Sequence, residues 1–298
     1  MREKIRSCAF LTLATLIWGS AFVSQSIAMD HMGPFTFQAL RCLLAVLGML
    51  PVIAISDKYK RDNSTFVKRW SDPKLWKAGI LCGLPLFLAC NLQQVGLVET
   101  DAGKSGFLTA MYIIIVPVIG IFRKQKPTVM IPISVVLATI GLYCLSCVGV
   151  TTIRTGDLLT LGCAVMFAVQ ITFVDIFASS VDPLRLNTIQ AVVCAVLSSV
   201  VMVLTESPSW SDIITCVIPL AHVGLLSMGV AYSLQIIAQK NLEPSAASLI
   251  MSLESVFAVI CSTLILKTTM TIWETIGCFL VFSAIIISQI PVPQRKTT

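Results

Sequence analysis

Charged residues are scarce in this chain. Only 12% of its 298 residues are Asp, Glu, Lys or Arg, whereas 56% are hydrophobic. A soluble globular domain carries about 25% charged residues, so this composition excludes a water-soluble fold. We therefore expect an integral membrane protein.

Motifs for nucleotide chemistry and covalent catalysis are also missing. The chain has no Walker loop, no glycine-rich dinucleotide turn and no Ser/His/Asp set. Its two histidines, His31 and His222, are isolated, and its eleven cysteines are an odd number without disulfide spacing. The Cys144/Cys147 pair has no His or carboxylate beside it. We expect no cofactor, no metal, no ATP-driven pumping by this chain alone and no enzymatic activity.

Long apolar runs dominate what is present. Each of ten runs is long enough to cross a hydrocarbon core of about 30 Å as a helix. Continuous apolar runs without two-residue alternation favour helices over a barrel. The predicted spans are residues 8–28, 35–55, 75–97, 103–122, 128–148, 156–176, 185–204, 213–237, 245–266 and 272–290.

The distribution of basic residues predicts the orientation of these spans. With both termini in the cytoplasm, every Lys and Arg lies on the cytoplasmic side except Lys104, Arg154 and Lys267 outside and Arg41 within a span. The positive-inside rule favours this arrangement, so the formal charge of +6 reports topology and gives no support for nucleic-acid binding. A cleavable signal peptide at the N-terminus is the alternative, but its removal would leave nine spans.

The chain also repeats itself. Leu92-Gln93 precedes Asp101 as Leu234-Gln235 precedes Glu243. This repeat predicts two units, residues 1–150 and 151–298, with a cytoplasmic linker at 56–77 in the first. Five spans in each unit is an odd number, so the second unit would lie inverted in the membrane. Inverted repeats are typical of secondary transporters.

Several segments resemble EamA-type carriers of the drug/metabolite transporter superfamily. The resemblance covers about residues 8–290 and implies a ten-helix fold of two inverted five-helix repeats that moves small metabolites such as amino acids. Ser255 stands where the family usually has proline, so we expect a helix break at Pro117 in the first unit and none at the equivalent place in the second. The matching segments are LIWGSAF (16–22), GPFTF (33–37) with Leu40-Arg41, DAGKSGFLT (101–109) with Val116-Pro117, PSAA (244–247) and SLESVFA (252–258).

Polar and aromatic residues inside the spans are the candidate site residues. Glu254 is a carboxylate deep in a span, where desolvation favours its neutral form. It either couples protons or binds a substrate amine, or else it bonds a neighbouring helix. Arg41 either binds a substrate carboxylate, bridges helices or extends to the interface. Gln93 and Gln235 occupy equivalent positions and suit either cavity rims or interhelical bonds. The remaining candidates, which the resemblance places in the cavity, are Trp18, Tyr112, Gln170 and Tyr232.

These features favour a multi-pass secondary transporter of small organic metabolites, working by export or exchange in a bacterial inner membrane. Its expected partners are a small-molecule substrate, the lipid bilayer and protons, and it is a monomer or a homodimer. A non-transporting membrane scaffold and an integral-membrane enzyme are the alternatives. Against the enzyme hypothesis, the sequence lacks the paired acids or metal ligands within one leaflet that such chemistry needs. The scaffold hypothesis does not explain the polar residues in the spans, which are costly to bury in lipid.

Overall fold

The computed structural model describes residues 2–59, 69–100, 102–125, 128–146, 153–266 and 270–290, and this part of the chain is helical, without strands. Lys60 and the rest of linker residues 60–68, together with Asp101, lie outside the described residues. The elements are α1 (Arg2–Met29), α2 (Pro34–Tyr59), α4 (Pro73–Gly96), α5 (Ala102–Ala110), α6 (Tyr112–Phe122), α7 (Met130–Ser146), α8 (Thr155–Phe177), α9 (Pro183–Thr205), α10 (Trp210–Thr215), α11 (Val217–Ala221), η1 (His222–Ala231), α12 (Tyr232–Gln239), α13 (Pro244–Met251), α14 (Leu253–Leu266) and α15 (Ile272–Ser288).

The helices are long and apolar enough for a bilayer. Within the described residues, eight helical stretches have the length and hydropathy of membrane spans, and α7 and α15 are shorter apolar helices of 17 residues each. Large apolar side chains such as Leu47, Ile121 and Val203 are exposed on the outside of the bundle. An exposed apolar surface of this extent is unstable in water and suits lipid. The prediction of an all-α membrane protein is confirmed.

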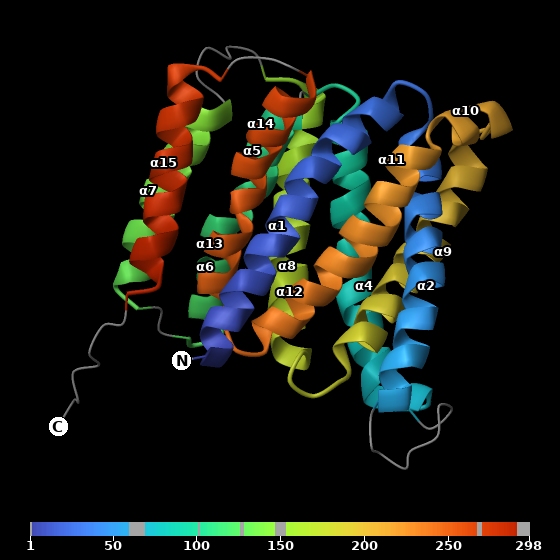
Figure 1. Ribbon diagram of the computed structural model, residues 1–298, viewed down its shortest axis with the longest axis horizontal. Coiled ribbons are helices and arrows are strands. Elements are labelled where there is room, and N and C mark those ends of the chain that lie inside the picture. The colour runs from blue at the N-terminus through green and yellow to red at the C-terminus, as the bar shows by residue number, and fades with distance from the viewer. Residues whose placement is uncertain are drawn as a thin grey trace.

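The helices stand side by side and form one bundle (Figure 1). α7 packs against α15 at one end of the bundle, and α2 and α4 pack against α9 at the other. Between these ends, α1 contacts α12 and α14, while α8 contacts α4, α5 and α6. The bundle therefore places α1 and α8 centrally, where they can line an internal space.

Two helices extend further into the predicted linker than the sequence indicated. α2 continues to Tyr59, and α4 begins at Pro73, inside the segment 56–77. Asp72 is the N-cap of α4, and its side chain accepts a hydrogen bond from the Lys74 backbone N–H at 2.9 Å. Asp is a favoured N-cap and proline a favoured first residue, so this sequence starts a helix although the segment is rich in charge.

Helix breaks occur in both halves, so the expectation of a break only near Pro117 is wrong. The path of α5 and α6 is interrupted at Met111, and that of α13 and α14 is interrupted at Ser252. Ser252 donates its hydroxyl to the Leu249 carbonyl at 2.7 Å, and the Ser255 N–H bonds only three residues back, to Ser252. Serine hydroxyls compete for helix carbonyls in this way. A break at this place therefore needs no proline.

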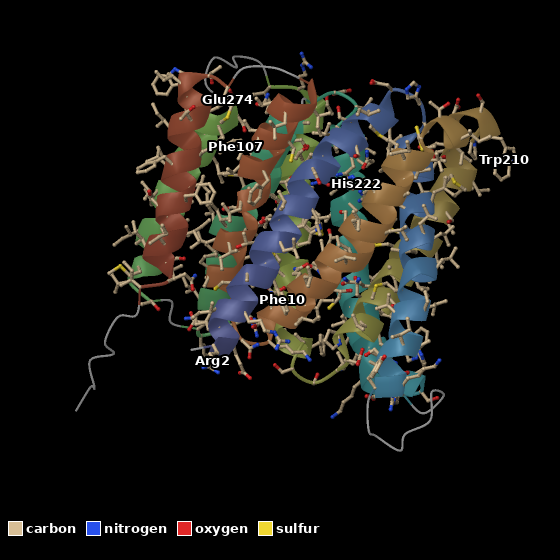
Figure 2. All side chains as sticks on the ribbon, viewed as in Figure 1. Arg2, Phe10, Phe107, Trp210, His222 and Glu274 are labelled. Carbon is tan, nitrogen blue, oxygen red and sulfur yellow. The ribbon has the colours of Figure 1, made fainter. Side chains whose placement is uncertain are left out.

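The segment that leads to α12 contains a π-helix, η1. The Tyr232 backbone N–H at its end donates to the carbonyl of Ser227, five residues back. Its first residue, His222, lies within hydrogen-bond distance of Ser20 (3.2 Å) and Ser24 (2.9 Å) on α1. Figure 2 shows His222 in the upper half of the bundle beside α1. π-helical turns often mark functional segments, because they leave helix carbonyls without their usual partners.

The two ends of the α2–α9 pair are joined by carboxylates. Glu206, just after α9, accepts hydrogen bonds from the backbone N–H groups of Phe35 (2.9 Å) and Thr36 (2.7 Å) in the first turn of α2. At the opposite end, Asp57 in the last turn of α2 pairs with Arg185 in the first turn of α9. A carboxylate at a helix N-terminus is stabilised by the exposed N–H groups and the helix dipole. The end of α9 is thus bound to the start of α2, and the end of α2 is bound to the start of α9.

Candidate functional site

One internal cavity contains every residue that the sequence proposed for the site. About 550 Å³ of space between its walls, including the part open to solvent, is not filled by protein atoms. Helices from both halves of the chain line it. The lining residues are Trp18, Phe22, Gln25, Arg41, Gln93, Tyr112, Phe167, Gln170, Ile171, Ser227, Met228, Tyr232, Gln235, Met251 and Glu254.

An aromatic pair forms one wall. The rings of Trp18 on α1 and Tyr232 on α12 meet edge to face, with centroids 5.0 Å apart. This is a favourable arrangement for aromatic quadrupoles and holds both rings in place. The Tyr232 hydroxyl lies 3.8 Å from the Cys90 sulfur, while the Trp18 indole N–H is buried and has no partner among the described residues. This wall therefore offers the cavity one donor, the indole N–H of Trp18, that is unpartnered within the described residues.

Glu254 sits beside the helix break at the centre of the bundle. It is the second residue of α14, two positions after Ser252, and is 7% exposed. The Tyr112 hydroxyl on α6 donates to its carboxyl at 2.9 Å. No lysine or arginine in the described part of the chain forms an ion pair with it. A buried carboxyl with one neutral donor is poised either to hold a proton or to meet a cationic group.

Arg41 is buried at 4% exposure and does not extend to the interface. Its Nη1 donates to Gln25 Oε1 on α1, so it bridges α1 and α2, as one of the sequence alternatives proposed. Its guanidinium carbon lies 5.8 Å from the centre of the Phe37 ring. No carboxylate among the described residues pairs with it, and its Nε is buried without an acceptor. The positive charge of this guanidinium is therefore not balanced by a described carboxylate, and an anionic group in the cavity could pair with it.

The glutamines face the cavity and not lipid. Gln93 on α4 is 6% exposed and donates to the Thr109 hydroxyl on α5 at 3.1 Å. Gln235 is 1% exposed, and its amide nitrogen donates to Gln170 Oε1 on α8 at 3.3 Å. The two interpretations of Gln93 and Gln235, a place on the cavity wall and a hydrogen bond between helices, are therefore compatible. Each side-chain amide bonds to a neighbouring helix and also lines the cavity.

Comparison with known proteins decides the family. The model of the EamA-like transporter family matches the chain twice, at residues 5–147 and 154–289. This chain belongs to the EamA-like transporter family.

Two further similarities agree with that assignment. An uncharacterized transporter from Archaeoglobus fulgidus is 32% identical over 283 residues, which cover 93% of this chain and 83% of the relative. A solved structure, "Crystal structure of protein", superposes with a TM-score of 0.79 over 95% of both chains at 14% identity, which shows the same fold. The EamA-like chain described here is therefore a membrane transporter, and the resemblance seen in its sequence is confirmed.

Some cavity residues of this EamA-like transporter escaped the sequence reading. Phe22 and Gln25 lie four and seven residues after Trp18, on the same face of α1. Met251 lies three residues before Glu254, at the end of α13 and on the other side of the break at Ser252. Helical spacing from an identified residue is the signal that could have found Phe22 and Gln25. Ser227 gave no such signal, because it lies in η1, where the π-helix changes the spacing.

Proposed function

We propose that this protein is a secondary transporter of small amino-acid-like metabolites, which bind in the central cavity. The observation that carries the proposal is that Arg41 and Glu254 both line one mainly apolar cavity, and neither forms an ion pair within the described part of the chain. A solute with a carboxylate and an amine would meet both groups. Phe22, Phe167 and Met228 would contact its apolar part.

We further propose that all ten apolar helices cross the membrane as two inverted five-helix repeats, residues 1–150 and 151–298. Two side-chain contacts support this arrangement: Tyr112 with Glu254, and Cys90 with Tyr232, each 142 residues apart. Gln93 and Gln235 have the same separation. A two-fold axis in the membrane plane brings equivalent residues together in this way, and rocking about it would open the cavity to either side alternately.

The proposed orientation has both termini in the cytoplasm of a bacterial cell. Arg2, at the start of α1, and the end of α15 lie at the same edge of the bundle, whereas Glu274 lies at the opposite edge (Figure 2). The basic residues near Arg2 and Arg123 favour the cytoplasm for that edge.

Labelling of single cysteines tests the orientation. In a variant without native thiols, Tyr59→Cys is expected to react with an impermeant maleimide only from the cytoplasmic side, and Ile153→Cys only from the outside. Both side chains are more than four-fifths exposed, so access to the reagent is not limiting. Labelling of the two positions from the same side would contradict the inverted arrangement.

An enzyme is a weaker interpretation of the same cavity. Of the carboxylates in the described ranges, only Glu254 lines it, and neither histidine does. General acid–base chemistry most often uses a histidine or a pair of carboxylates, and the described lining offers neither. A scaffold leaves Arg41 and Glu254 on the cavity wall unexplained, since charged groups inside apolar spans are costly.

Solute flux in proteoliposomes tests the proposed function. Proteoliposomes that contain the purified protein are loaded with one labelled solute at a time. The solutes are amino acids and their 2-oxo and 2-hydroxy analogues. Exchange of the labelled solute for unlabelled solute outside the vesicles is then measured. Saturable exchange of at least one carboxylate-bearing solute is expected, and protein-free liposomes are the control. Absence of exchange for every compound would refute the proposal.

A further inference from the structure

A chain of five side-chain amides runs from the cavity wall into the packing between α8, α9 and α12. Only Gln170 and Gln235 line the cavity, and none of the five is more than 3% exposed. The members are Asn187 and Gln190 on α9, Gln170 on α8, and Gln235 and Gln239 on α12.

One end of the chain is fixed by the π-helix. Because the Tyr232 N–H bonds to Ser227, the Met228 carbonyl is left for another donor. The Asn187 amide nitrogen donates to the Met228 carbonyl at 3.0 Å and to the Gly229 carbonyl at 2.9 Å. Backbone carbonyls only accept hydrogen bonds, so the nitrogen of Asn187 must face them and its oxygen must face away.

This orientation passes along the chain. Asn187 Oδ1 accepts from Gln190 Nε2 at 2.8 Å, and Gln190 Oε1 accepts from Gln170 Nε2 at 3.3 Å. Each amide therefore presents its nitrogen to the preceding oxygen. At the cavity, Gln170 must present its oxygen.

The other end is fixed in the same way. Gln239 Nε2 donates to the Ile171 backbone carbonyl at 3.1 Å, which leaves Gln239 Oε1 to accept from Gln235 Nε2 at 3.0 Å. The Gln235 nitrogen also donates to Gln170. A rotation of the Gln235 amide by half a turn would set its oxygen against two other oxygens. Both N–H groups of Gln235 are thus used, and its Oε1 is buried without a partner among the described residues.

We propose that Gln235 Oε1 accepts a hydrogen bond from the transported solute, specifically from an ammonium or hydroxyl group. Asn187, Gln190 and Gln239 are positioning residues that hold the oxygen toward the solute. The inference rests on the proposed function and adds a selectivity rule to it. A solute with a carbonyl at this place would set oxygen against oxygen and leave a buried acceptor unpaired, which weakens binding by about tenfold or more.

Binding of matched solutes to the purified full-length protein tests the rule. The probes are leucine, 2-hydroxy-4-methylpentanoate and 4-methyl-2-oxopentanoate, and the corresponding set phenylalanine, 3-phenyllactate and phenylpyruvate. Within each set only the group at carbon 2 differs. The amine and hydroxyl compounds are expected to bind at least about tenfold more tightly than the oxo compound.

Variants separate the acceptor from its support. Gln235→Met is expected to bring the ratio between amine and oxo compounds to within about twofold, since the acceptor is gone. Gln190→Met does not change a cavity residue and is expected to lower the ratio between amine and oxo compounds only in part. If Gln235→Met does not fold, Gln190→Met is used as the test instead. Gln94→Met is the control, because Gln94 is equally buried but lies outside both the cavity and the amide chain.

Three results would overturn the inference: equal binding of oxo and amine compounds to the unchanged protein, an unchanged ratio in Gln235→Met, or no binding of any donor-bearing probe. The flux panel keeps the two proposals apart. If a solute is exchanged and its exchange does not depend on Gln235, this inference is wrong but the proposed transporter function is not contradicted. If no solute is exchanged, the proposed function itself is wrong.

Discussion

Glu254→Gln is expected to abolish accumulation of substrate against its gradient while exchange of substrate across the membrane survives. Glutamine keeps the shape of the side chain and can still accept the hydrogen bond from Tyr112, but it cannot take up or release a proton. Among the described residues, Glu254 is the only carboxylate on the cavity wall, so no other described acid there can replace it. The measurement is uptake into proteoliposomes with and without an imposed proton gradient.

Two further variants control this result. Glu254→Asp keeps a titratable group and should retain part of the proton-driven uptake. Glu3→Gln makes the same chemical change at an exposed position in the first turn of α1 and should have no effect. If Glu254→Gln still accumulates substrate in response to a proton gradient, Glu254 does not couple protons, and its role is to bind the substrate amine or to bond α6 to α14.

Arg41→Met is expected to weaken binding of carboxylate-bearing substrates by about 30-fold or more. Loss of one partner from a buried, hydrogen-bonded charge pair costs about 2–5 kcal/mol, or roughly 30-fold to several thousand-fold in affinity. The fold should persist, because methionine removes a buried charge that lacks an anionic partner in the described structure. Equilibrium binding and thermal unfolding of the purified variant measure the two effects.

The chemistry of the arginine side chain supplies the controls for this variant. Arg41→Lys keeps the charge without the planar fork, so intermediate affinity is expected. Arg6→Met changes an exposed arginine near the N-terminal end of α1 and should leave binding unchanged. Near-normal binding by Arg41→Met would show that Arg41 acts only as the bridge to Gln25.

The candidate site was readable from the sequence to an unusual degree, and the reason is the bilayer. Polar side chains inside apolar spans are costly, so the few that occur, such as Arg41, Gln93 and Glu254, have to face an interior space or each other. All eight predicted residues line the same cavity. Whether they bind substrate is what the variants above measure.

Other features depend on contacts that no local pattern reports. The break at Ser252 arises from serine hydroxyls that bond to helix carbonyls, whereas the sequence argument relied on proline alone. The π-helix at His222 has no clear sequence marker, so Ser227 was missed. The direction of the Gln235 amide depends on Asn187 and Gln239, which are fixed by carbonyls on other turns and helices. Such long-range constraints exist only once the helices have packed.

Accessibility of a cavity residue from both sides of the membrane tests the central claim most directly. Ser227 lines the cavity, is 6% exposed and differs from cysteine by one atom. In a variant without native thiols, Ser227→Cys is expected to react slowly with a small impermeant thiol reagent applied from either side, and a transported solute should slow both reactions. Reaction from one side only, or reaction that no transported solute affects, would contradict a cavity that opens alternately to the two sides.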